Sequence, residues 1–122
     1  DAGDVPDNAE CSPVDTPVDF DGPDAYFATV PVRELIAASK EVGVPARISN
    51  TAGTHLCNNI LYATRHYIET NDLSIQSGFV HVPFSHEQVA RHDEISPSMS
   101  YDAMERSIQA MLNHLASDSN VD

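Results

Sequence analysis

Two side chains of this sequence could together carry out nucleophilic chemistry, the thiol of Cys57 and the imidazole of His81. A thiolate attacks carbonyl carbon atoms, and a neighbouring imidazole can accept the thiol proton and later donate it to a leaving group. Either residue by itself is as well explained by an ordinary buried position, because free cysteines and isolated histidines are common in protein interiors. The interpretation therefore depends on the elements that must bring the two side chains together.

The segment around Cys57 is typical of a strand, a tight loop and a helix. A β-branched run at 44–49 is followed by a turn rich in Ser, Asn, Thr and Gly, and an apolar period typical of a helix continues to Thr70. Thr54 is the expected N-cap, which puts Cys57 at about the third helical position. The N–H groups and the dipole of a helix start favour a thiolate and could donate to a developing oxyanion.

The remaining elements follow from apolar periodicity and from the residues that begin and end helices. Pro31 suits the first turn of a helix, Gly43 ends that helix, and Ser100 is the expected N-cap of the last helix. In chain order we expect a short helical turn over 23–29, a helix over 30–42, a strand over 44–49, a helix over 54–70, a strand over 75–83, an irregular polar segment over 85–98 and a helix over 100–117.

This order predicts an α/β fold: an open, mostly parallel sheet with helices on both faces, in three layers. Residues 1–122 then form part of a single α/β domain, and residues 1–21 form an extended acidic lead-in. Sites in such sheets form at the carboxyl ends of strands. Cys57 and His81 are separated by one helical excursion, which is what a βαβ unit places between neighbouring strand ends. We therefore expect the thiol and the imidazole at the same sheet edge.

Two helices carry an apolar stripe that should face the core. The residues of the first stripe recur at i, i+4, i+7 and i+11, which puts them on one side of the helix, and we expect this side to pack on the sheet. The stripe over 54–70 consists of Leu56, Ile60, Ala63 and Tyr67, and the stripe over 100–117 consists of Met104, Ile108, Met111, Leu112 and Leu115.

Charge is the strongest compositional signal. The 122 residues include 19 acidic and 6 basic side chains, for a formal net charge of -13, so nucleic acids and anionic membranes are poor partners. The acidic residues are dispersed along the chain and Lys40 is the only lysine, which favours a salt-adapted protein over an ordinary acidic one. No apolar run reaches the length of a membrane span and no signal peptide opens the chain, so we expect a soluble cytoplasmic protein with reduced thiols.

Other candidate sites are weaker. His81, His86 and His92 have an irregular spacing that matches no zinc pattern, so we expect no metal site. His66 and His114 are expected to be solvated. Gly53 stands alone, which does not suffice for a glycine-rich phosphate loop.

Two motifs resemble the signatures of the pyroglutamyl-peptidase I (pyrrolidone-carboxylate peptidase) family. The first is Ser-Asn-Thr-Ala-Gly-Thr-His-Leu-Cys-Asn at 49–58, and the second is Gly-Phe-Val-His-Val-Pro at 78–83. Weaker similarity comes from Val-Pro-Asp-Asn at 5–8, Gly-Pro-Asp-Ala-Tyr-Phe at 22–27 and Pro-Ser-Met-Ser at 97–100. The resemblance thus covers nearly the whole chain.

The resemblance implies a cysteine omega-peptidase that releases N-terminal pyroglutamyl residues from peptides through a thioester, with no cofactor. Cys57 would be the nucleophile and His81 its partner in a Cys-His-Glu triad. The family's proteins are larger and this chain resembles their C-terminal part, so the glutamate is expected upstream of Asp1. The family also implies a homo-oligomer, commonly a tetramer.

One residue departs from the family pattern. His55 stands where the family usually has a phenylalanine or tyrosine that walls the substrate ring, so His55 and the adjacent Leu56 are the candidate substrate-binding residues. Two alternatives stay open: a related cysteine hydrolase with an altered substrate, and a non-catalytic α/β binding or interaction domain.

Overall fold

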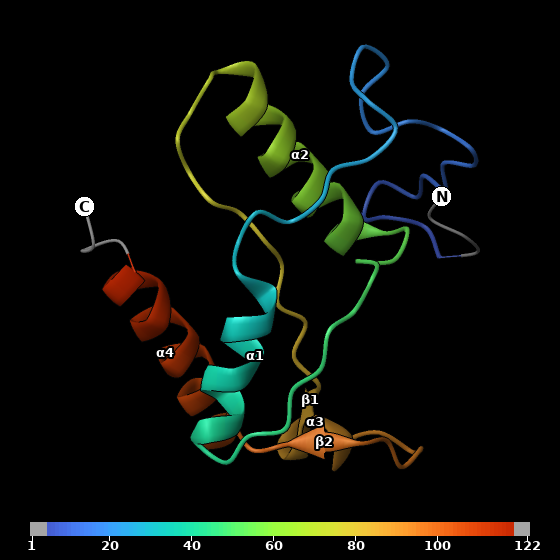
Figure 1. The fold of residues 1–122 in the computed structure, drawn as a ribbon. Coiled ribbons are helices and arrows are strands. Elements are labelled where there is room, and N and C mark those ends of the chain that lie inside the picture. Colours follow the sequence, from blue (N-terminus) through green and yellow to red (C-terminus); the bar gives the residue numbers. More distant parts are fainter. Residues whose placement is uncertain (1–4, 119–122) are drawn as a thin grey trace. The chain divides into compact units, whose positions relative to one another are not determined.

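The computed structural model describes residues 5–118, of which Asp118 is described by its backbone alone. Figure 1 shows the elements in chain order: α1 (Val32–Glu41), α2 (Leu56–Thr70), β1 (Phe84–Ser85), α3 (His86–Val89), β2 (Ser98–Met99) and α4 (Tyr101–Asp118). The chain forms two compact units. Unit 1 comprises Asp1–Val30 and Ser49–Val80, and unit 2 comprises Pro31–Ile48 and His81–Asp122.

Unit 1 is built around α2. Two segments without regular structure, one before and one after α2 in the sequence, meet at Thr29 and Ser77, where the Thr29 N–H donates to the Ser77 carbonyl over 2.7 Å and the Ser77 N–H donates to Thr29 Oγ1 over 2.9 Å. The same two segments also approach each other closely at Gly78, where an added Cβ would lie 2.5 Å from Val30 Cγ2. A glycine is therefore favoured where the second motif begins, because any larger residue would require Val30 to shift.

Unit 2 is built on α1 and α4, which pack side by side (Figure 1). Leu35 of α1 and Met111 of α4 are buried, and fully buried Ser39 joins α1 to α4 through Ser107 Oγ at 2.7 Å. The Ser39 hydroxyl also donates to the Val44 carbonyl over 3.1 Å. The end of α1 is thereby fixed to both the following segment and the last helix.

The helix boundaries follow the local signals closely. Gly43 adopts φ +77° directly after α1, a left-handed conformation that favours glycine, and the Ser100 hydroxyl accepts from the Ala103 N–H at the start of α4. Pro31 is the N-cap of α1 and not its first residue. Of the expected inner stripe of α4, Met111 is buried but Leu112 is 54% exposed.

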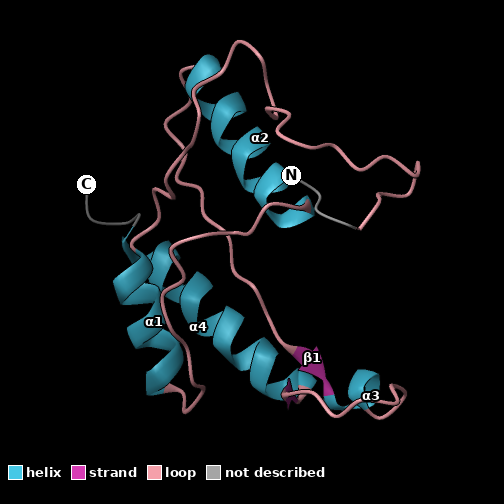
Figure 2. Cartoon of the chain, turned by 90° about the vertical axis from the view of Figure 1, so that its right-hand side faces the viewer, coloured by secondary structure: helices cyan, strands magenta, loops and turns pink. Residues whose placement is uncertain are grey.

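The strands differ from expectation. Residues 44–49 and 75–83 are neither helix nor strand, and Figure 2 shows that the strands, in magenta, are short. The ladder present among the described residues joins β1 and β2 in parallel, with Phe84 opposite Ser98 and Ser85 opposite Met99. A strand exists only where a neighbour completes its hydrogen bonds, and apolar sequence cannot supply that neighbour.

Two short segments also differ from expectation. Residues 23–29 form no helical turn, whereas the supposedly irregular 85–98 segment contains α3. Ser85 begins α3 with a capping box: its hydroxyl accepts from the Gln88 N–H, and the Gln88 side chain accepts from the Ser85 N–H. Among the described helices, none has the length and apolar character needed to cross a membrane.

Candidate active site

Cys57 lies at the start of α2, as the loop-then-helix pattern predicts. His55 is the N-cap and Cys57 the second helical residue, so the expected N-cap at Thr54 is wrong by one position. The thiol is free of any disulfide and half-buried. The first turn of α2 contains no acidic residue, so no carboxylate there offsets the positive end of the helix dipole. This setting suits a nucleophile, because the backbone N–H groups of a helix start are available as hydrogen-bond donors.

The loop before Cys57 is held by its own short polar side chains. The Ser49 hydroxyl donates to the Thr51 carbonyl over 2.8 Å, and the Gly53 N–H donates to Thr51 Oγ1 over 3.0 Å. Gly53 has φ +82°, and a Cβ there would meet nothing within 4 Å. Glycine is thus favoured by backbone conformation alone, and it directs the chain into the first turn of α2.

The candidate substrate-binding residues adjoin the thiol in sequence and differ in exposure. His55 is half-buried, and its Nε2 lies 3.3 Å from the Val5 carbonyl oxygen. Leu56 is 60% exposed. The carbonyl at Val5 is a contact that sequence reasoning missed, because residues 5 and 55 are joined only by the fold. The role of His55 and Leu56 in binding a substrate stays a prediction.

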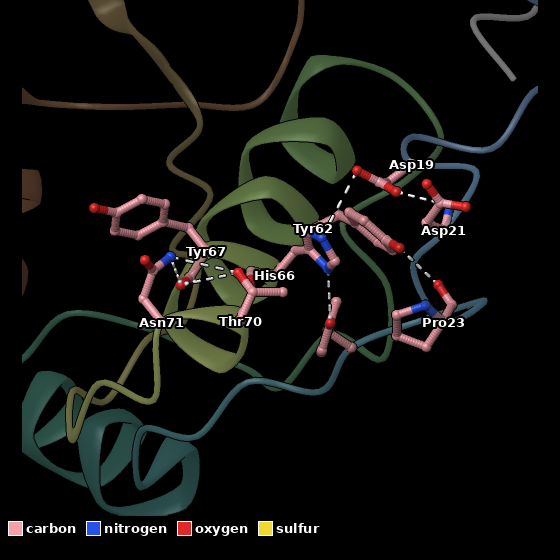
Figure 3. A network of polar contacts seen from close by, with 9 residues as sticks. Asp19, Asp21, Pro23, Tyr62, His66, Tyr67, Thr70 and Asn71 are labelled. Atoms are coloured by element: carbon pink, nitrogen blue, oxygen red, sulfur yellow. Dashed lines mark hydrogen bonds and ion pairs between the residues drawn. The ribbon is translucent and has the colours of Figure 1, made fainter.

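A polar and aromatic cluster fixes the middle of α2 to the segment before α1 (Figure 3). Tyr62 is buried, and its hydroxyl donates to the Pro23 carbonyl over 2.7 Å. His66 stacks on Tyr62, its Nδ1 lies 2.9 Å from the Tyr26 hydroxyl, and its Nε2 lies 3.7 Å from Asp19 Oδ2. The expectation that His66 is solvated is therefore wrong. A helical period shows which side of a helix a residue is on, but it does not reveal contacts with residues that are distant in the sequence.

The pKa of Tyr62 is raised above its ordinary value, first by burial and then by the neighbouring Tyr26, Asp19 and Asp24. The hydroxyl thus keeps its proton, and this is the form that donates to Pro23. The aromatic cluster continues to Arg65, whose guanidinium lies 5.8 Å from the centre of the Tyr26 ring. These contacts give the helix that carries Cys57 a fixed attachment within unit 1.

The C-terminal end of α2 is closed by a Schellman motif. The Leu73 N–H donates to the Ile68 carbonyl and the Asp72 N–H to the Glu69 carbonyl, at 3.0 and 3.2 Å. Asp72 occupies the left-handed position of the motif with φ +52°. Side chains complete the cap, since the Asn71 amide donates to the Tyr67 carbonyl over 2.8 Å (Figure 3). Both ends of the helix that carries Cys57 are thus fixed by local contacts.

His81 is exposed and lies in the segment that leads into β1, outside any helix or strand. The expected strand at this position is therefore wrong. Cys57 belongs to unit 1 and His81 to unit 2, and their pairing stays a prediction.

Two further histidines, His86 and His114, have polar partners. His86 Nδ1 lies 2.8 Å from Ser98 Oγ, and His114 Nε2 lies 2.9 Å from Glu34 Oε2. The second contact joins α4 to α1, so the expectation that His114 is merely solvated is wrong. Within residues 5–118, no group of three His, Cys, Asp or Glu side chains could hold a metal ion.

Comparison with known proteins gives a consistent result. The family model described as pyroglutamyl peptidase matches residues 1–117. The chain is 42% identical over 108 residues to pyrrolidone-carboxylate peptidase 1 of Caldanaerobacter subterraneus subsp. tengcongensis, covering 88% of this chain and 53% of that protein. It is 44% identical over 108 residues to the pyrrolidone-carboxylate peptidase of Streptomyces coelicolor, covering 88% and 49%.

Solved structures agree. The pyrrolidone carboxyl peptidase of the hyperthermophile Pyrococcus furiosus matches with a TM-score of 0.88 at 32% identity, over 94% of this chain and 57% of that one. With the parallel β1–β2 ladder, this confirms the α/β class. The chain spans about half the length of the relatives that it matches.

Proposed function

This chain belongs to the pyroglutamyl peptidase family, and from that premise we propose that its protein is a cysteine peptidase that releases N-terminal pyroglutamyl residues from peptides. The observation that carries the proposal is the position of Cys57, half-buried at the second residue of α2 with no carboxylate in the first turn. That position supplies the nucleophile and, through the helix start, hydrogen-bond donors for an oxyanion.

The proposed reaction proceeds in two steps. The Cys57 thiolate attacks the pyroglutamyl carbonyl carbon, and the N–H groups at the start of α2 stabilise the oxyanion. As the C–N bond breaks, the His81 imidazolium donates a proton to the leaving amine, and a thioester is left on Cys57. Water, deprotonated by His81, then attacks the thioester, and the C–S bond breaks to release pyroglutamate and restore the thiolate and the imidazolium. His55 and Leu56 would line the binding site for the lactam ring.

The third group of the triad is assigned to a carboxylate in the part of the relatives' length that this chain does not span. Such a group would orient the His81 ring and stabilise its imidazolium. We further propose that the protein acts in the cytoplasm as a homo-oligomer, with a tetramer as the expected form. Neither Cys11 nor Cys57 is in a disulfide, which accords with a reducing compartment.

Alkylation tests the nucleophile without requiring turnover. Cys11 is exposed and Cys57 is half-buried, so accessibility alone would make Cys11 react faster with iodoacetamide. If the helix start activates Cys57, mass spectrometry should find Cys57 labelled first near neutral pH, because the thiolate is the reacting form. Faster labelling of Cys11 would refute activation and favour a non-catalytic domain.

Turnover is tested with a fluorogenic pyroglutamyl amide, using the protein expressed together with its native flanking sequence. Cys57→Ser and His81→Ala should each reduce kcat by about 10⁶-fold, as removal of the nucleophile or the base does in a serine-protease triad. Cys11→Ser, the matched control, should leave the rate unchanged. Retained activity in Cys57→Ser would refute the mechanism, and preferential cleavage of other aminoacyl amides would establish a hydrolase with an altered substrate.

A further inference from the structure

Helix α2 buries an arginine and exposes the stripe that was expected to face the core. Leu56, Ile60 and Tyr67 are 60%, 56% and 63% exposed, so the expectation that their side of α2 packs on a sheet is wrong. The buried residues of α2 are Tyr62, Arg65 and Ile68. Arg65 is only 5% exposed, and an arginine is rarely buried to this extent unless its charge is paired.

The pairing of Arg65 is incomplete. Its Nη2 donates to Glu69 Oε1 in an ion pair between successive turns of α2, and its guanidinium lies over the Tyr26 ring. A guanidinium has five N–H donors, and the Nε–H of Arg65 is buried without a hydrogen-bond partner among the described residues. An unsatisfied donor on a buried charged group costs free energy, so this side chain has room for a further acceptor.

Arg65 also lines a surface cavity of about 300 Å³ in unit 1. Thr29, Ser74 and Gln76 contribute polar side chains to the lining, and Glu69 lies on it as well. The Ser74 hydroxyl and the Gln76 amide are hydrogen-bond donors of the kind that complete an anion site. A buried guanidinium, an unpartnered Nε and neutral donors thus occur together around one cavity.

We propose that this cavity binds a small monocarboxylate, with the Arg65 guanidinium as its charged partner. The two oxygens of a carboxylate match two neighbouring N–H groups of a guanidinium. The ligand replaces Glu69 at the edge formed by Nε and Nη2 and satisfies both donors. Glu69 then turns to solvent, where its side chain is already 53% exposed.

Charge favours a monoanion over a dianion such as sulfate. One guanidinium supplies a single positive charge, Glu69 lies on the same cavity, and the whole chain has a net charge of -13. The inference does not depend on the proposed function. Arg65 follows Cys57 by eight residues, which is about 12 Å along the axis of a helix.

The test measures binding without turnover, with propionate as the probe and the protein expressed together with its native flanking sequence. Saturation-transfer nuclear magnetic resonance detects the bound ligand through the propionate signals, at constant ionic strength. We expect saturable transfer in the wild type. Arg65→Met should weaken propionate binding by about tenfold or more, because charge-assisted hydrogen bonds are lost.

The matched control is an arginine that is paired in the same way but exposed. Arg106 of α4 pairs with Asp102 over 3.0 Å, again between successive turns of one helix, and its side chain is 53% exposed. Arg106→Met should change propionate binding by less than about twofold, because an exposed pair is already solvated.

Two conservative variants separate a binding role from a structural one. Glu69→Gln removes the competing carboxylate and should strengthen propionate binding by about threefold, whereas a purely structural Arg65–Glu69 pair predicts no gain. Arg65→Lys keeps the charge but offers no pair of parallel N–H groups, so it should weaken binding. Circular dichroism establishes that each variant is folded, and if the Arg65 variants are not, Glu69→Gln decides.

Three results would overturn the proposal: no saturation transfer from propionate in the wild type, equal losses in Arg65→Met and Arg106→Met, or unchanged binding in Glu69→Gln. Stronger competition by sulfate than by acetate would overturn the assignment to a monocarboxylate. Hydrolysis of a pyroglutamyl amide is measured separately, so the proposed function and the anion site can fail independently.

Discussion

Replacing Ser39 should reveal how unit 2 is held together. Ser39 is fully buried, and its single hydroxyl proton is donated to the Val44 carbonyl over 3.1 Å. The 2.7 Å contact with Ser107 must therefore be donated by the Ser107 hydroxyl. Ser39→Ala removes both hydrogen bonds and leaves a carbonyl and a hydroxyl without their partner, whereas Ser107→Ala removes only the second.

The magnitudes follow from that count. A buried hydrogen bond contributes about 1 kcal/mol net, so Ser39→Ala should lower the free energy of unfolding by about 2 kcal/mol and Ser107→Ala by about 1 kcal/mol. Once Ser39 is gone, Ser107 has no bond to lose. The double variant should then resemble Ser39→Ala, and the coupling between the two residues should be about 1 kcal/mol.

Urea unfolding followed by far-ultraviolet circular dichroism measures these values, provided that the m value is the same in all four proteins. A shift in the midpoint at constant m reports stability alone. Additive effects, with the double variant near 3 kcal/mol, would show that Ser107 does not bond to Ser39. A cost below about 0.5 kcal/mol for Ser39→Ala would refute the reasoning altogether.

Four further outcomes are expected. Gly22→Ala would place a Cβ against the Tyr62 hydroxyl, so its midpoint in urea should fall further in the wild-type background than in Tyr62→Phe. Asp72→Gly should raise the unfolding free energy by about 1 kcal/mol, because φ +52° suits glycine and strains other residues; an unchanged midpoint would contradict the Schellman assignment. The pKa of Glu87 is lowered from its ordinary value of 4.5, first by the hydrogen bond to its own backbone N–H and then by the Ser85 hydroxyl. The ionised side chain therefore stabilises α3 above pH 4.5, and this stabilisation is lost as the pH falls through the lowered pKa. Amide exchange in α3 should accelerate in that pH range, and it should accelerate less in Glu87→Gln. With a net charge of -13, the melting temperature should rise steeply from low to molar salt, and a salt-independent value would remove the case for salt adaptation.

The helices were predictable because their signals are local. Gly43 acts through its own backbone conformation and Ser100 through a hydroxyl three residues from its donor, so the C-terminal end of α1 and the start of α4 follow from short stretches of sequence. The loop before Cys57 is equally local, since its hydrogen bonds join residues two positions apart. This is why the thiol was placed within one position of where it lies.

The contacts that fix α2 were not predictable. His66 reaches Tyr26 and Asp19, and Tyr62 reaches Pro23, across about 40 positions of sequence. A helical period tells which residues share a side of α2 but not which side meets a partner, and the apolar side proved to be the exposed one. The nearest available sequence signal was the aromatic pair Tyr26 and Phe27.

The sequence by itself determined the long helices α1, α2 and α4, the position of Cys57 at a helix start and the family. Local hydrogen bonds and a specific motif need no distant partner, so they can be read from short stretches. Tertiary structure decided where strands exist, which side of α2 is covered and what surrounds His66. Each of these features depends on a second segment that completes a ladder, a packed face or a hydrogen bond. Residues 44–49 lie outside any strand because a strand needs a neighbour to complete its hydrogen bonds.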